Sequence, residues 1–74
     1  YSKKQNAQTT EMRQMAMYIV REMTGLSTKL IGREFNRDHS TVVYSLDKFT
    51  KRYHEDSKLR SVVDNIIKNI RDGR

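Results

Sequence analysis

Apolar residues recur three and four positions apart along most of the chain, the spacing that places side chains on one face of an α-helix. The first run follows Thr10, which suits a helix N-cap, and ends before Gly25, a residue type common just after a helix. Its apolar members are Met12, Met15, Ala16, Ile19, Val20 and Met23. The pattern predicts a helix between Thr10 and Gly25 whose apolar face, methionines included, belongs to the core.

The next two runs are separated by one tight turn. Ser27 suits the N-cap of a short helix, whose apolar residues are Leu30, Ile31 and Phe35. Asn36 tolerates the positive φ of a tight turn, and Asp38 suits the N-cap of the helix that follows. The apolar residues of this third helix are Val42, Leu46, Phe49 and Tyr53. Two helices joined by so short a turn indicate a helix-turn-helix arrangement.

A final amphipathic run follows Asp56 and Ser57, and its stripe is expected to close the core. Its apolar residues are Leu59, Val62, Val63, Ile66, Ile67 and Ile70. The chain has no proline and no run that alternates as a strand does. We therefore predict an all-α fold: a small helical domain over residues 10–74, with a helix-turn-helix core flanked by two longer amphipathic helices. Residues 1–9 are expected to form a basic arm or the end of a linker.

Charge and composition narrow the function classes. Fifteen Lys and Arg against nine Asp and Glu give a net charge of +6, which favours a polyanionic partner such as nucleic acid. The absence of cysteine excludes disulfides and thiolate zinc sites, and His39 and His54 are too isolated for a metal site or a catalytic triad. No enzyme is expected. No apolar run approaches the roughly 20 residues of a membrane span, so we expect a soluble protein. The lack of cysteine permits a reducing cytoplasm, where we expect the protein to lie. A start at Tyr1 suggests a piece of a longer polypeptide.

Two segments carry a more specific signal. One runs from Met12 to Tyr18 and continues at Glu22-Met23-Thr24, and the other runs from Ile31 to Phe35 and on through Arg37-Asp38-His39-Ser40-Thr41-Val42. Their order and separation resemble the C-terminal DNA-binding domain, domain IV, of the bacterial chromosomal replication initiator DnaA. The resemblance extends over about residues 10–70, which is most of the chain.

This resemblance implies an all-helical domain that binds short, asymmetric double-stranded boxes of the TTATCCACA type at replication origins. The domain would act as a monomeric module, with its helix-turn-helix in the major groove and the preceding arm in the adjacent minor groove. ATP binding and oligomerisation belong to an upstream ATPase domain of such initiators. The present 74 residues contain nothing similar to a phosphate-binding loop, so no cofactor is expected in this chain.

The start of the third predicted helix supplies the candidates for base readout, because polar side chains at a helix tip offer donors and acceptors to base edges. The resemblance places His39 and Ser40 at this tip. Asp38 suits the N-cap, and the resemblance implies a second role for it as the acceptor for a cytosine amino group. Thr41 is expected to contact phosphate or a thymine methyl, against an ordinary early-helix role. Val43 could meet a thymine methyl or stand in solvent as a single exposed valine.

A second group of residues is expected to contact DNA outside the helix tip: Arg13, Gln14, Thr28, Lys29, Arg37 and Lys48, with Lys4 in the minor-groove arm. Arg13, Lys29 and Lys48 are expected on the phosphate backbone. Thr28 and Lys29 stand where many relatives carry an apolar residue followed by proline, so hydrogen bonding or charge is expected to replace an apolar DNA contact there. The resemblance assigns the Arg-Gln pair and the basic residue at position 48 to phosphate, although a solvated charge is the alternative for Lys48. Gln5, beside Lys3 and Lys4, stands where relatives carry a minor-groove arginine, and lysine fits that groove less well. Asn36 stands where relatives have two glycines, which is expected to shorten the turn by one residue.

Two other functions compete with DNA recognition. A helical protein-interaction module would use the basic surface for acidic partners and would need an exposed apolar groove. Few apolar residues lie outside the four stripes, Tyr18 and Tyr44 being the main exceptions. A nonspecific or RNA-binding basic domain would bind scrambled duplex equally well. Neither alternative accounts for the composition of Arg37 to Val42.

Overall fold

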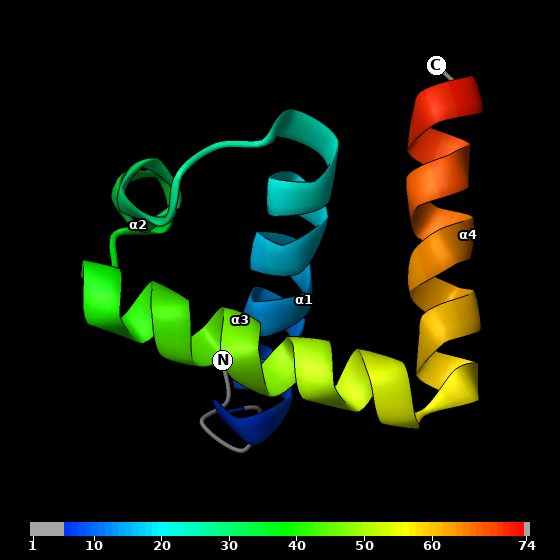
Figure 1. Ribbon diagram of the computed structural model, residues 1–74, viewed down its shortest axis with the longest axis horizontal. Helices are drawn as coiled ribbons and strands as arrows, with labels where there is room; N and C mark the ends of the chain where they lie inside the picture. The colour runs from blue at the N-terminus through cyan, green and yellow to red at the C-terminus, as the bar shows by residue number, and fades with distance from the viewer. Residues whose placement is uncertain (1–5, 74) are drawn as a thin grey trace.

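A computed structural model of the chain describes the backbone of residues 6–73 and the side chains of residues 10–73 (Figure 1). This part of the chain is all-α, as predicted. Its helices are α1 (Asn6–Thr24), α2 (Thr28–Phe35), α3 (His39–Glu55) and α4 (Ser57–Gly73). Lys3, Lys4 and Gln5, which carry the expectation for the arm, lie outside the described residues.

Helix α3 is the centre of the arrangement. It runs across the molecule and contacts α1, α2 and α4. In Figure 1, α2 lies over the N-terminal part of α3, whereas α4 rises from its C-terminal end beside α1. Helices α2 and α4 do not contact each other within the described residues. The two ends of α3 therefore have different surroundings.

The core has two parts along α3. At its N-terminal half, Met17 of α1, Ile31 of α2 and Val42 of α3 are completely buried and pack together. Toward its C-terminal half, Phe49 and Val63 are buried, and the Tyr18 ring lies 5.1 Å from both the Phe49 and the Tyr53 ring. Tilted rings at this separation attract one another through their quadrupoles in addition to the area they bury.

The helix ends agree with the local signals in the sequence. Helix α1 ends before Gly25, which has a φ of 73°. The Ser27 hydroxyl caps α2 by accepting a hydrogen bond from the Leu30 N–H at 3.2 Å. Asn36 adopts the left-handed conformation, with φ 57° and ψ 46°, and ends α2. The Asp38 carboxylate caps α3. The predicted helix-turn-helix is thus confirmed at its caps and its turn.

Two predictions for α1 were wrong. The helix begins at Asn6, before the expected N-cap Thr10. Met12, predicted in the core, is 67% exposed, while Met17, outside the predicted stripe, is completely buried. The reason is that α1 contacts α2, α3 and α4, so its buried surface is wider than a single stripe and centres on another register.

Helix α4 closes the core only in part. Asp56 precedes it, and its carboxylate accepts hydrogen bonds from the N–H groups of Lys58 and Leu59 at 3.0 and 3.1 Å. Val63 is buried, but Val62 and Ile70 of the same predicted stripe are 48% and 51% exposed. Without contact to α2, α4 has neighbours along only part of its apolar surface. None of the described helices combines the length and apolar character that crossing a membrane requires.

Candidate nucleic-acid interface

The turn between α2 and α3 depends on a close backbone approach. The Arg37 N–H donates to the Gly32 carbonyl at 2.8 Å, so the chain folds back tightly onto α2. A Cβ atom at position 32 would lie 2.6 Å from the Arg37 carbonyl oxygen, a separation that real Cβ atoms do not show. Gly32 is therefore the residue that lets α2 and the start of α3 meet at this distance.

Arg37 also holds this turn through its side chain. The guanidinium Nη1 donates to the Asn36 carbonyl at 3.0 Å and to the Phe35 carbonyl at 3.4 Å. These are carbonyls at the end of α2, where intrahelical donors are lacking. Arg37, a candidate for DNA contact, is thus already hydrogen-bonded within the turn through Nη1. The remaining N–H groups of its guanidinium are still available as donors.

Helix α3 begins with a charged cap. The Asp38 carboxylate accepts from the Thr41 N–H at 2.9 Å. This backbone hydrogen bond, followed by one from the Thr41 side chain, lowers the pKa of Asp38 below its usual value, because both favour the charged form. His39 and Ser40 follow in the first turn, and both are exposed. Neither side chain forms a hydrogen bond or ion pair with the described part of the chain.

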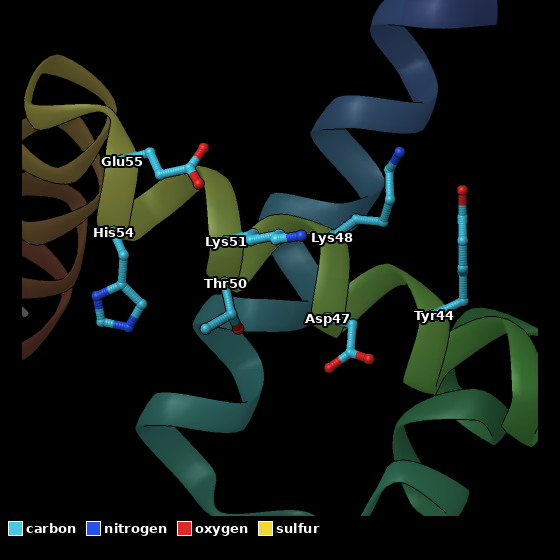
Figure 2. A pocket seen from close by; sticks show the side chains of 7 residues that line it. All are labelled: Tyr44, Asp47, Lys48, Thr50, Lys51, His54 and Glu55. Atoms are coloured by element: carbon cyan, nitrogen blue, oxygen red, sulfur yellow. The ribbon is translucent and has the colours of Figure 1, made fainter.

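The same side of α3 continues as an exposed surface beyond the first turn. Val43 is 40% exposed and Tyr44 is 59% exposed, as expected for residues outside the core stripe. Lys48 is also exposed, and its ammonium lies 5.6 Å from the centre of the Tyr44 ring. Figure 2 shows both side chains extending from the same side of the helix. His39, Ser40, Val43 and Lys48 are therefore all exposed on α3.

The other candidates for DNA contact in the described chain lie on α1 and α2. Lys29 is exposed and Thr28 half-buried in the first turn of α2, where free N–H groups attract anions. Arg13 is half-buried on α1. Gln14 beside it is only 8% exposed, so little of its side chain can reach a partner. Within the described side chains, no group of three His, Cys, Asp or Glu residues is arranged to hold a metal ion.

Tyr44 is the residue of this surface that sequence reasoning did not assign to the site. From the sequence it is only an apolar residue outside the four apolar stripes. The available signal was its spacing, since it follows Ser40 by four residues and precedes Lys48 by four, and such residues share one helix face. Tyr18, noted in the same way, instead packs between α1 and α3 against Phe49 and Tyr53.

Comparisons with known proteins agree with this arrangement. Residues 1–49 match the family described as bacterial dnaA protein helix-turn-helix. The chain is 36% identical over 70 residues, 95% of its length, to the chromosomal replication initiator protein DnaA of Caldanaerobacter subterraneus subsp. tengcongensis. It is 42% identical over 59 residues, 78% of its length, to the protein of the same name from Microcystis aeruginosa. The chain spans 16% and 13% of these two relatives. No solved structure matches it.

Proposed function

Because the chain belongs to the bacterial DnaA helix-turn-helix family, we propose that it binds short, asymmetric origin boxes in double-stranded DNA as the recognition domain of a replication initiator. The observation that carries this proposal is the start of α3. Its backbone is held by the Asp38 cap and by the close approach at Gly32, while His39 and Ser40 are exposed and form no hydrogen bond with the described part of the chain. A rigid helix tip with uncommitted polar side chains suits direct readout in the major groove.

Each residue of the tip has a chemically suitable role. The imidazole of His39 and the hydroxyl of Ser40 can donate to or accept from base edges. The Asp38 carboxylate accepts from Thr41 N–H with one oxygen, and its remaining acceptor positions suit a cytosine amino group. Capping and base contact are therefore compatible. The exposed Val43 suits contact with a thymine methyl.

Phosphate contacts would set the position of the domain on the duplex. We assign these to Arg13, Lys29 and Lys48, with Lys29 beside the free N–H groups that begin α2. The burial of Gln14 argues for a smaller contribution from that side chain. The domain acts as a monomeric module, and ATP binding is assigned to another part of the much longer initiator.

The test is a fluorescence anisotropy titration on a duplex with a TTATCCACA-type box and on a scrambled duplex, at several salt concentrations. A preference of about 1,000-fold or more for the box at physiological salt supports the proposal. His39→Ala is expected to reduce box binding by about 1 to 3 kcal/mol and to relax specificity at one base pair. The matched control is His54→Ala, which removes an exposed histidine from the other end of the same helix.

Other outcomes point elsewhere. Equal and steeply salt-dependent binding to both duplexes would contradict sequence-specific recognition and leave a nonspecific basic domain. Binding to neither duplex would favour the second candidate, a protein-interaction module. The observation in favour of that candidate is the exposed apolar surface of α4 at Val62 and Ile70. Unchanged box preference in His39→Ala would contradict the assigned readout.

A further inference from the structure

Tyr44 occupies a central place on the outward face of α3. The completely or almost completely buried residues Val42 and Phe49 define the inward face of this helix, and Tyr44 is 59% exposed away from it. It lies one turn after Ser40 and one turn before Lys48. The aromatic ring therefore stands between the polar tip and the first lysine of the helix. A large, mostly exposed ring at this place has no role in the core.

Within the described chain, one cation lies over the ring. The Lys48 ammonium lies 5.6 Å from the ring centre, within the range at which the negative face of an aromatic ring attracts a cation. Figure 2 shows the two side chains extending together from α3, while Asp47 points to the other side of the helix in this view. The contact restricts a side chain that is otherwise among the most flexible.

We propose that Tyr44 is a positioning residue that holds the Lys48 ammonium for contact with a DNA phosphate. The proposal rests on the proposed function, because it deepens the role of Lys48 in DNA binding. The ring occupies one side of the ammonium and leaves its other N–H donors for a phosphate oxygen. Lys48 then enters the complex with fewer conformations to lose, so the same charge contributes more affinity. The contact is independent of base sequence.

The next lysine on α3 provides a contrast. Lys51 is exposed on the same helix, but its neighbours four residues away in either direction are the acids Asp47 and Glu55. The corresponding neighbours of Lys48 are Tyr44 and Arg52. Carboxylates at these positions repel a phosphate near Lys51, whereas an aromatic ring does not. Lys48 is thus the better placed of the two lysines, and Lys51 is the matched control.

The test is a double-mutant cycle measured by the same anisotropy titrations on box and scrambled duplex. Tyr44→Leu removes the ring and retains an apolar side chain, Tyr44→Phe retains the ring and removes the hydroxyl, and Lys48→Gln removes the charge. Tyr44 and Lys48 are exposed, so the variants are expected to fold, which circular dichroism and thermal unfolding would verify. Lys51→Gln replaces Lys48→Gln in the control cycle.

We expect Tyr44→Leu to weaken binding to both duplexes by about two- to five-fold, and Tyr44→Phe to recover most of this loss. Lys48→Gln should reduce the salt slope by about one, and in that background Tyr44→Leu should have no further effect. In the Lys51→Gln background, Tyr44→Leu should weaken binding as much as it does in the unmodified domain. A loss of affinity in Tyr44→Leu that Tyr44→Phe restores, with normal folding in both variants, is not expected from a merely structural role.

The proposal would be overturned by additive effects of the Tyr44 and Lys48 changes, by equal coupling of Tyr44 to Lys51, or by a Tyr44→Phe variant as weak as Tyr44→Leu. A Tyr44→Leu defect confined to one base pair of the box would also overturn it, because it would make Tyr44 a base contact. A different result, no preference of the unmodified domain for the box, would contradict the proposed function. The coupling between Tyr44 and Lys48 is measurable on either duplex in that case.

Discussion

The two ends of α3 use polar side chains in opposite ways. At the C-terminal end, the Tyr53 hydroxyl donates to the Asp64 carboxylate at 2.7 Å, and Arg60 donates to the carbonyls of Tyr53 and His54, each at 3.0 Å. These bonds join α3 to α4. At the N-terminal end, His39 and Ser40 have no such bonds to the described residues. One helix therefore uses polar side chains to hold the fold at one end and leaves polar side chains exposed at the other.

The N-terminal end can leave these side chains uncommitted because its backbone is held by other means. Asp38 satisfies a free N–H of the first turn, Asn36 reverses the chain, and Arg37 binds the carbonyls at the end of α2. Of these three residues, only Asp38 lies directly before α3. It caps the helix and is also a candidate for base contact. The difference between the ends indicates where a substitution should affect stability and where it should affect binding alone.

Gly32→Ala is the substitution expected to have the largest effect on the difference between the two ends of α3, because it disturbs the turn that holds the N-terminal end. The added Cβ would lie 2.6 Å from the Arg37 carbonyl oxygen, which is backbone and cannot move aside as a flexible side chain would. We expect the free energy of unfolding to fall by about 1 to 3 kcal/mol, as for other overpacked sites, in urea unfolding followed by circular dichroism. Gly73→Ala, where nothing lies within 4 Å of the new Cβ, is the control. Equal effects of the two substitutions would contradict the tight turn.

The turn and the caps were predictable because their causes are local. Ser27 and Asp38 bond to N–H groups three residues away, and Asn36 needs only its own tolerance of a positive φ. Such signals do not depend on where distant helices lie. The helix-turn-helix core and its candidate recognition helix could therefore be placed from residue types and spacing.

The buried face of α1 could not be placed in this way. Met12 and Met17 are the same residue type, and only the positions of α2, α3 and α4 determine that the first is exposed and the second buried. Tyr18 and Tyr44 are a similar pair, one packed among aromatic rings and one on the surface. The bonds of Arg37 to the end of α2 likewise appear only when the turn is folded. Residue type alone does not predict the burial and contacts of such side chains, because their partners are distant in the sequence or come into reach only when the turn is folded.

A second test of the N-terminal half is Ser27→Ala. The substitution removes the acceptor for the Leu30 N–H and leaves a free donor at the start of α2. We expect a loss of about 1 kcal/mol in the free energy of unfolding, measured in the same urea titrations. Ser27→Asp, which retains a capping oxygen, should recover the loss. No difference between alanine and aspartate at this position would contradict the capping role.

Tyr53→Phe tests the C-terminal end. It retains the ring beside Tyr18 but removes the hydrogen bond to Asp64, and at this exposed site we expect a loss of roughly 0.5 to 1 kcal/mol. Box affinity should remain unchanged, which would sharpen the difference between the two ends. A variant with normal stability and weakened DNA binding would reverse the assignment of the ends.

The same bond predicts a dependence on alkaline pH. Donation to Asp64 favours the protonated hydroxyl and raises the pKa of Tyr53 from 10.0 to about 12. Because the folded pKa lies above the unfolded one, the contribution is complete below pH 10.0 and is lost as the pH rises toward 12. The stability difference between the unmodified chain and Tyr53→Phe should therefore shrink across this window in unfolding titrations.

The smallest expected effect concerns the charge of the Asp38 cap. Its hydrogen bonds lower the pKa of the carboxyl below the ordinary value of 3.8, so the carboxylate stabilises the fold above 3.8 and this contribution is lost as the pH falls through the folded pKa. Asp38→Asn retains a capping oxygen without the charge. The thermal midpoint of the unmodified chain should exceed that of the variant at neutral pH, and the two should converge on the acid side of 3.8. Other carboxyl groups titrate in both proteins and cancel, so a difference independent of pH would show that the cap acts without its charge.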